Sequence, residues 1–355
     1  MRIERVELEP VCYRLRKSVR THRAELRERR GWRVRLSGTD SRLGLGEALP
    51  LPEFGSEPPH ECLRALESLA TRLHARAGTL EQLLDLVDQT CPDAPAACCA
   101  FDGALHDLAA HVEGIALARL LGTQPPVAVH VNALITAAGV EESVAAARAA
   151  QARGFRTFKL KVGSSGPSQD EARLRAVRDA LGDAPRLRID ANGAWDADTA
   201  IAFLERVAPL EIELVEQPVP ARDLTGLARV HHEAPIAVAA DETLVRSEGR
   251  EAVLEEDVAA FAVLKPMLLG GLRSCQRFAR AASARGVRCF VTTSFESWIG
   301  TGQAAHLAAA IQLGSRACGL ASCDLLEAAF PPELIPVEGQ ILIHDRPGLG
   351  CVEPA

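Results

Sequence analysis

The sequence predicts an α/β protein in which a (β/α)7β barrel follows a smaller α+β domain. From about residue 127 onward, short apolar or β-branched runs alternate eight times with longer alanine-rich amphipathic stretches, which is the pattern of βα units. Polar residues recur at the ends of five successive apolar runs. The first 125 residues lack this rhythm, so we expect them to form a separate layer.

The amino-terminal part has the mixed pattern of an α+β capping domain. Strand-like alternation covers residues 4–15 and 31–36, and helical periodicity covers 61–75 and 96–121. A proline-rich loop at residues 49–54 follows Glu47. We therefore predict a capping domain at residues 1–125. The tail at 327–355 is rich in Pro and Gly, contains a strand-like run at 340–344, and is expected to pack back on this domain.

Residues 126–326 are expected to form the barrel, a TIM barrel of (β/α)7β type. The predicted strands are residues 127–135, 157–162, 187–190, 212–216, 236–240, 260–265, 288–293 and 318–322. The clearest predicted helices are residues 141–153, 169–180, 197–207 and 272–284. An open doubly wound sheet is the alternative, but eight repeats and the positions of the polar residues favour closure.

The net charge and the apolar runs of the sequence exclude some classes of binding partner. With 40 basic and 47 acidic residues the net charge is −7, which argues against nucleic acid or an anionic membrane as the main partner. The amino terminus lacks the apolar core of a signal peptide, and no apolar run approaches the ~18 residues of a membrane span. We therefore expect a soluble, cytoplasmic protein whose ten cysteines are reduced core thiols. Homo-oligomerisation is left open.

The segment 14–35 is locally basic. It includes Arg20, His22 and Arg23. A solvated edge explains such a cluster, and a lid that attracts an anionic substrate is the alternative. The sequence does not choose among these three side chains as substrate contacts.

Five polar sites stand at the carboxyl ends of successive predicted strands. They are Lys159 with Lys161, then Asp190, Glu216, Asp241 and Lys265. The step from Lys161 to Asp190 is 29 residues and the step from Asp241 to Lys265 is 24, about one βα unit each. Barrel enzymes place their active sites at this end. Each motif alone is typical of a cap, a turn or a solvated surface, but their joint occurrence favours a site.

Three carboxylates that converge on one point repel one another unless a cation neutralises them, and carboxylate oxygens suit Mg²⁺. Lys159 and Lys161, two apart on one strand, both face the barrel mouth. Two crowded ammonium groups beside a metal would each have lowered basicity, as a general base near pH 7 requires. Lys265 is expected across the mouth, with a small-molecule carboxylate substrate between the lysines. By strand alternation Glu242 should point elsewhere.

With these motifs the chain resembles the enolase superfamily, and within it the muconate-lactonizing-enzyme subgroup. The resemblance implies that Asp190, Glu216 and Asp241 hold Mg²⁺, with Mn²⁺ as a substitute. It also implies that Lys161 is the principal acid/base and Lys265 the lysine across the site, acting through an ene-diolate. A barrel kept only as a non-catalytic scaffold would have lost such a set.

Local segments resemble one branch, the o-succinylbenzoate synthases, which are dehydratases of menaquinone biosynthesis. Residues 46–54 (GEALPLPEF) are similar to that family's capping loop, although Glu53 replaces its usual glycine. Residues 131–135 (VNALI) and 294–297 (SFES) also fit. N-succinylamino acid racemase and muconate cycloisomerase stay as alternatives.

Dipeptide epimerases place an Asp-x-Asp pair on the eighth strand to bind the substrate ammonium, where this chain has Gly319 and Ala321. An eighth strand without acid groups suits an uncharged ring with a succinyl chain. The expected substrate contacts are Asn192, Ser294, Glu296, Gly319 and Ala321.

Overall fold

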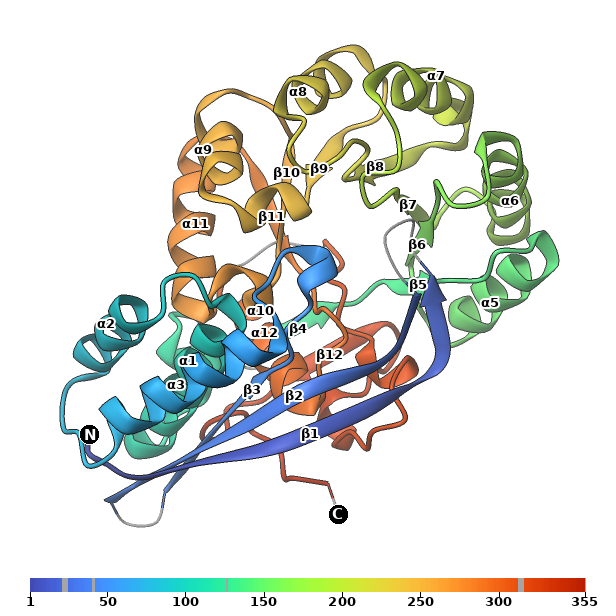
Figure 1. The fold of residues 1–355 in the computed structure, drawn as a ribbon. Coiled ribbons are helices and arrows are strands. Elements are labelled where there is room, and N and C mark those ends of the chain that lie inside the picture. Colours follow the sequence, from blue (N-terminus) through green and yellow to red (C-terminus); the bar gives the residue numbers. More distant parts are fainter. Residues whose placement is uncertain (21–24, 40–41, 126, 312–315, 355) are drawn as a thin grey trace.

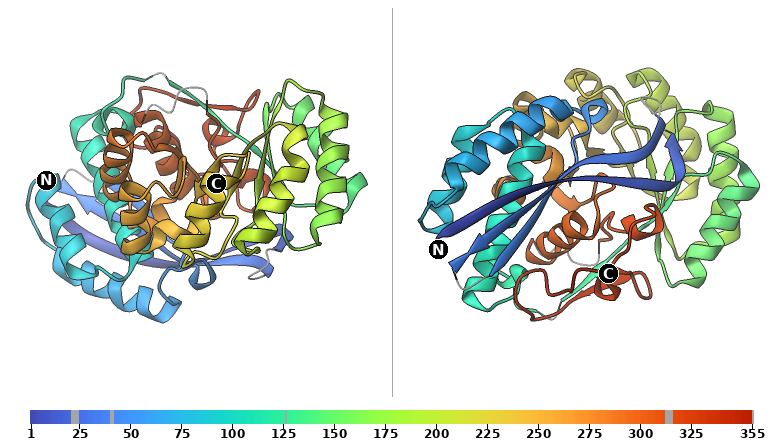
Figure 2. Two further views of the ribbon diagram at one scale, coloured as in Figure 1. Left: turned by 90° about the horizontal axis from the view of Figure 1, so that it is seen from above. Right: turned by 60° about the horizontal axis from the view of Figure 1, so that its bottom comes forward.

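The computed structural model describes residues 1–20, 25–39, 42–125, 127–311 and 316–354. Its amino-terminal part begins with an antiparallel sheet of order β1-β2-β3. The strands are β1 (Ile3–Arg20), β2 (Glu25–Gly38) and β3 (Leu43–Ala48). The first two form a hairpin much longer than the sequence predicted. Figures 1 and 2 show this ribbon reaching from the amino-terminal helices to the green part of the barrel.

Helices cover one face of this sheet. They are α1 (Pro59–Leu73), α2 (Leu80–Thr90) and α3 (Pro95–Glu113). The short α4 (Leu117–Leu120) follows and packs against α12 (Trp298–Ala310) in the barrel core. Helix α3 lies so close to β3 that a Cβ atom at Gly46 would stand 1.8 Å from the carbonyl oxygen of Ala100. The helix predicted at 96–121 is interrupted because Gly114 adopts φ 68°, a left-handed conformation that ends α3. The prediction missed α2, whose Thr79 and Gln82 form a capping box.

A curled parallel sheet forms the barrel. In order around the sheet the strands are β5 (Ala133–Ile135), β6 (Thr157–Lys161), β7 (Arg186–Asp190), β8 (Ile212–Glu216), β9 (Val238–Ala240), β10 (Phe261–Leu264) and β11 (Arg288–Val291). The gap between β11 and β5 is closed by two parallel bridges, from Thr292 to Gly319 and from Cys318 to Val131. The eighth strand is therefore present as single-residue bridges, shorter than the predicted strand at 318–322.

The barrel helices lie outside the strands, as Figure 1 shows for α5 to α9 and α11. Their bounds are α5 (Val140–Ala152), α6 (Pro167–Leu181), α7 (Ala197–Val207), α8 (Leu224–Glu233), α9 (Ser247–Glu255), α10 (Pro266–Leu269), α11 (Leu272–Ala284) and α12 (Trp298–Ala310). Fully buried side chains such as Phe158, Leu187 and Leu214 join strands to helices in one apolar core. This packing fixes the height of each strand end.

The predicted strand at 127–135 is two strands. β4 (Val127–His130) pairs antiparallel with β12 (Gln340–Ile343) from the tail, and only β5 belongs to the barrel sheet. The tail also touches the amino-terminal sheet, since Arg33 forms an ion pair with Glu353 at 2.5 Å. It therefore contacts both parts of the chain.

The β1–β2 hairpin packs on the barrel mouth through an apolar cluster. Leu15, Val19 and Leu26 join Leu51 and Phe54 there, so this end of the basic segment is more than a solvated edge. His22 and Arg23 lie outside the described residues.

All ten cysteines are free thiols and six of them are buried, but Cys12 is exposed and Cys91, Cys323 and Cys351 are half-buried, so the expectation that all ten lie in the core is wrong for these four. No helix in the described ranges has the length and hydropathy needed to cross a membrane.

Candidate active site

Three buried carboxylates meet at the carboxyl end of the barrel. Asp190 ends β7, Glu216 ends β8, and Asp241 directly follows β9. Each offers an oxygen within 4.8 Å of the oxygens of the other two, and the three residues are at most 2% exposed. Glu216 Oε2 has no hydrogen-bond partner among the described residues. An orphaned carboxylate oxygen in an all-oxygen donor set fits a hard divalent cation.

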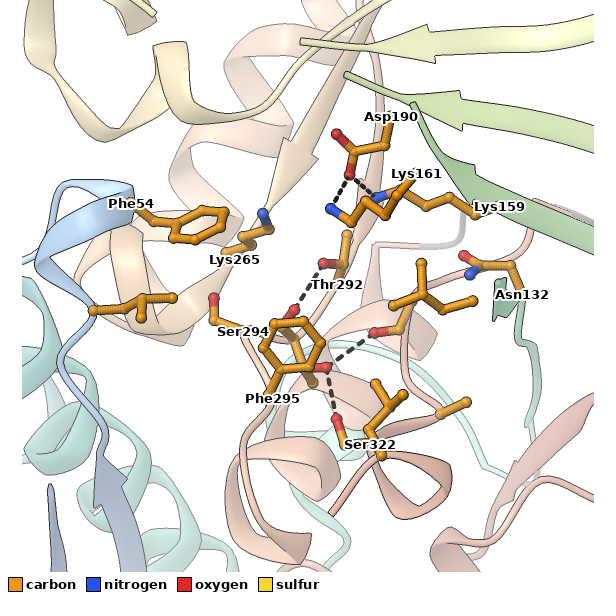
Figure 3. Close-up of a pocket in the computed structure, with 16 residues that line it drawn as sticks. Phe54, Asn132, Lys159, Lys161, Asp190, Lys265, Thr292, Ser294, Phe295 and Ser322 are labelled. Carbon is orange, nitrogen blue, oxygen red and sulfur yellow. Dashed lines mark hydrogen bonds and ion pairs between the residues drawn. The ribbon is translucent and has the colours of Figure 1, made fainter. Parts of the chain in front are cut away.

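The three lysines face these carboxylates. Lys159 Nζ lies 2.6 Å from Glu216 Oε1 and 2.8 Å from Asp190 Oδ2, and Lys161 Nζ lies 2.6 Å from the same Asp190 oxygen. Lys265 contacts Asp241 from the other side. Figure 3 shows Lys265 pointing toward the lysine pair across the pocket. The predicted grouping of lysines on opposite sides is present.

The expected fall in lysine basicity refers to lysines beside a bound metal ion and stays a prediction for that state; without the ion, the buried carboxylates act in the opposite direction. Burial lowers the pKa of Lys159, but the attraction of Asp190 and Glu216 outweighs it and the net pKa is raised. The pKa of Lys265 is raised in the same way, since Asp241 offsets its burial. Each ammonium has carboxylates rather than a second ammonium as its nearest neighbours, which is the physical reason.

The pKa values of Asp190 and Glu216 are shifted in opposite directions. Burial raises the pKa of Asp190, but Lys159 and Lys161 overcome this and hold it well below its usual range. Burial and the repulsion of Asp190 raise the pKa of Glu216. The lysines therefore stabilise the ionised form of Asp190 but do not offset the burial and repulsion that act on Glu216. A further cation at this point would stabilise the ionised form of all three carboxylates.

A polar relay extends from Lys161. Its Nζ donates to Asn192 Oδ1 at 2.8 Å, and Asn192 Nδ2 donates to Glu242 Oε1 at 3.0 Å. Glu242 is 2% exposed and faces this relay, so the expectation that it points away is wrong. A short 3-10 turn that begins at Glu242 replaces the strand alternation on which that expectation rested.

Gln217 positions the third carboxylate, and its role was not predicted. Its Oε1 accepts from the backbone N–H of Asp241 at 2.9 Å and from that of Thr243 at 3.1 Å. Gln217 has φ 39° and Asn192 has φ 48°, so both take the left-handed conformation within two residues of the end of a site strand. The polar Glu-Gln-Pro motif was the available signal for Gln217.

The pocket beside the lysines has an apolar wall and a wall of hydroxyl and amide groups. The apolar side chains are Leu51, Phe54, Leu134, Phe295 and Leu325, and the polar ones are Asn132, Thr292, Thr293, Ser294 and Ser322. The Phe54 ring centroid lies 5.7 Å from Lys265 Nζ. Among the described lining residues, only the three lysines and Asp190 carry charge. Figure 3 shows this lining.

The predicted substrate contacts divide into two groups. Ser294, Gly319 and Ala321 line the pocket. Asn192 and Glu296 do not: Asn192 holds Lys161, and the buried Glu296 carboxylate accepts from the backbone N–H of Ser294 in its own loop.

A buried arginine connects the pocket loops. Arg29 on β2 is 2% exposed and donates to the carbonyl oxygens of Ser294 at 3.1 Å, Pro50 at 3.2 Å and Leu49. The attraction of the buried Glu296 and Glu47 partly offsets the burial that lowers the pKa of Arg29. Arg29 thus holds together the hairpin, the loop that carries Phe54 and the loop that carries Phe295. Its contacts are all distant in sequence, so no local pattern marks it among the other arginines of the hairpin.

Comparison with known proteins agrees with this geometry. Residues 142–353 match the family described as enolase C-terminal domain-like. The chain is 41% identical over 229 residues to o-succinylbenzoate synthase of Thermobifida fusca, covering 63% of this chain and 70% of that one. It is 33% identical over 257 residues to muconate cycloisomerase 1 of Rhodococcus opacus, covering 71% and 68%. A dipeptide epimerase of Enterococcus faecalis V583, solved with Mg and the dipeptide L-Leu-L-Tyr, superposes with TM-score 0.93 at 27% identity, covering 99% and 100%.

Proposed function

Because the chain belongs to the enolase superfamily, in its muconate-lactonizing-enzyme subgroup, we propose that it is a Mg²⁺-dependent o-succinylbenzoate synthase. The reaction is the syn-dehydration of 2-succinyl-6-hydroxy-2,4-cyclohexadiene-1-carboxylate. The proposal rests chiefly on the pocket: beyond the lysines and Asp190 its described lining is uncharged, with aromatic and aliphatic side chains on one wall. Such a lining suits a ring substrate, and the 41% identity to a synthase supports the same choice.

In this proposal Asp190, Glu216 and Asp241 hold Mg²⁺, and Mn²⁺ could replace it. When bound, the ion would neutralise the substrate carboxylate and the charge that grows on it as the α-proton leaves. The orphaned oxygen of Glu216 and the mutual approach of the three carboxylates support this assignment.

Lys161 is the proposed acid/base. As the neutral amine it would take the α-proton, and it would then return that proton to the departing hydroxyl, which leaves as water. One lysine can serve both steps because proton and leaving group lie on the same face of the ring. The bond from Lys161 Nζ to Asn192 supports this role, since it restrains the amine at the pocket wall.

Lys265 would remain charged on the opposite face and stabilise the ene-diolate. Its place beside the Phe54 ring and against Asp241 supports that role, because both contacts favour the ammonium form. Lys159 also lines the pocket, but it contacts two of the metal carboxylates, Asp190 and Glu216, so we assign it to tuning these carboxylates and Lys161.

N-succinylamino acid racemase is the second candidate, because it needs the same lysine pair, and both Lys161 and Lys265 line this pocket. Dipeptide epimerisation has less support. Gly319 and Ala321 offer no carboxylate to a substrate ammonium, and the nearby Asp324 pairs with Arg153 at 2.9 Å on the surface. A non-catalytic scaffold is disfavoured by the complete set of carboxylates and lysines.

The test is kinetic and uses one preparation of the enzyme with Mg²⁺. We expect kcat/KM for the dehydration to exceed that for racemisation of N-succinylamino acids. A racemisation that is faster by tenfold or more would replace the synthase assignment with the racemase one.

A further inference from the structure

A second group of metal-ligand side chains lies at the barrel end opposite the active site. His231 and His232 stand in the last turn of α8, ahead of β9, and Asp257 stands between α9 and β10. Both segments lead into strands, so they lie at the amino ends of the barrel strands, whereas the active-site carboxylates lie at the carboxyl ends. Figure 1 shows α8 and α9 as neighbours in the outer ring of helices. The inference below does not depend on the proposed function.

The three side chains of this group converge on one point. Each offers one ligand atom, and these atoms all lie within 4.8 Å of one another. His231 Nε2 lies 3.5 Å from Asp257 Oδ1, and the rings of His231 and His232 have their centroids 5.1 Å apart. Two ligand atoms of a tetrahedral Zn²⁺ site, each ~2.0–2.2 Å from the ion, are roughly 3.3–3.6 Å apart. His231 and Asp257 therefore already have the spacing of two zinc ligands.

An ion can reach these side chains from solvent. His232 is exposed, and the side chains of Asp257 and His231 are 78% and 17% exposed. Among the described residues Asp257 forms an ion pair with His231 and with no lysine or arginine, so no fixed cation of the chain competes for its carboxylate. The site also lies at the carboxyl end of α8, a helix of ten residues, where the helix dipole favours a positive charge.

The donor set favours a transition-metal dication over Mg²⁺. Imidazole nitrogen suits Zn²⁺, Ni²⁺ and Cu²⁺, whereas Mg²⁺ takes oxygen ligands. Two imidazoles and one carboxylate supply three of the four tetrahedral positions, and water can take the fourth. We propose that His231, His232 and Asp257 bind Zn²⁺ or a divalent ion of the same class. The bound ion would join the end of α8 to the segment before β10.

The second ring nitrogen of His231 limits the expected affinity. Nε2 is the nitrogen that faces Asp257, so it is the ligand atom, while Nδ1 is buried and has no hydrogen-bond partner among the described residues. A metal-bound imidazole usually donates its other N–H to an acceptor, and the loss of that acceptor weakens metal binding by about 10–100-fold. We therefore expect Zn²⁺ to bind in the micromolar rather than the nanomolar range.

The test is calorimetric titration of the full chain with zinc chloride, with excess Mg²⁺ present so that the active-site carboxylates are occupied. We expect one Zn²⁺ per chain, with a Kd on the order of 10 µM. His232→Gln and Asp257→Asn should each weaken this binding at least tenfold, and both positions are exposed, so neither change should disturb the fold. Co²⁺, used as a spectroscopic substitute for Zn²⁺, should give visible absorption without the charge-transfer band of thiolate ligands, which would exclude the cysteines.

Two controls locate the site. His60→Gln is the matched control, because His60 is exposed and lies 3.8 Å from Glu61 but belongs to no group of three possible ligands among the described residues. It should bind Zn²⁺ like the wild type, and so should Asp190→Asn in the active site. The proposal is overturned if the wild type binds no Zn²⁺ tenfold above the expected Kd, or if the Co²⁺ spectrum is that of thiolate ligands. It is equally overturned if binding survives in both His232→Gln and Asp257→Asn, or is lost in Asp190→Asn.

Discussion

Replacing Arg29 with Met should destabilise the fold and open the pocket at once. The substitution keeps most of the side-chain volume but removes the donors that hold the carbonyl groups of Leu49, Pro50 and Ser294. Hydrogen bonds from a charged donor contribute ~1.5–3 kcal/mol each to stability. Part of this lost stability is recovered, because Glu296 and Glu47 can bind protons once the Arg29 guanidinium is removed. We expect a net destabilisation of about 3–5 kcal/mol, the range for breaking a buried charge network.

The assay is urea unfolding, followed by steady-state kinetics on the folded fraction. Arg29→Lys keeps the charge but cannot reach all three carbonyls, so about half of the loss should remain. Arg285→Met is the matched control, because Arg285 pairs with Glu255 in a half-exposed ion pair and should cost less than ~1 kcal/mol. KM should rise about tenfold in Arg29→Met, as both pocket loops lose their common tie, while kcat changes less. A variant within ~1 kcal/mol of the wild type, with KM unchanged, would refute this reasoning.

Three further predictions concern the lysines, specificity and pH. Lys161→Ala should reduce kcat by more than Lys159→Ala does, and Lys265→Ala should be as severe as Lys161→Ala, with Lys265→Arg recovering part; equal rates for all would contradict the assigned roles. Dipeptides should be poor substrates, because an unpaired ammonium in this pocket costs on the order of a few kcal/mol, and efficient epimerisation of Ala-Glu would show otherwise. Burial raises the pKa of Glu296 from 4.5 to about 7, so the stability given by its neutral form is complete below pH 4.5 and is lost as pH rises through 7. The Glu296→Gln side chain stays neutral at every pH. Its free energy of unfolding in urea should therefore rise relative to that of the wild type by up to ~3 kcal/mol between pH 5 and pH 8, and a difference in unfolding free energy that does not change with pH would disprove this.

The sequence was sufficient for the parts of the site that strand spacing determines. Asp190, Glu216 and Asp241 come together because each follows an apolar run that packs at the same height in the barrel. Helix α11 has the predicted bounds, since its amphipathic pattern is strong and glycines flank it on both sides.

The features that we could not predict from the sequence depend mostly on contacts between residues far apart in the chain. The apolar run at 127–135 has the pattern of one strand, but its first half, β4, pairs with β12 from the tail. No local sequence pattern predicts that pairing. The charge state of Lys159 depends on carboxylates 31 and 57 positions away, and the tie made by Arg29 depends on carbonyls 20 to 265 positions away. The place of Glu242 depended on a turn, where strand alternation no longer applies.

The most direct test of the central claim is the metal dependence of the dehydration. The enzyme is exhaustively chelated, assayed with the cyclohexadiene substrate, and assayed again after Mg²⁺ is restored, alongside Asp190→Asn and Asp241→Asn. Our account predicts that turnover falls below about 1% without metal, returns with Mg²⁺ in the wild type, and does not return in either folded variant. Full turnover of the chelated wild type would contradict it.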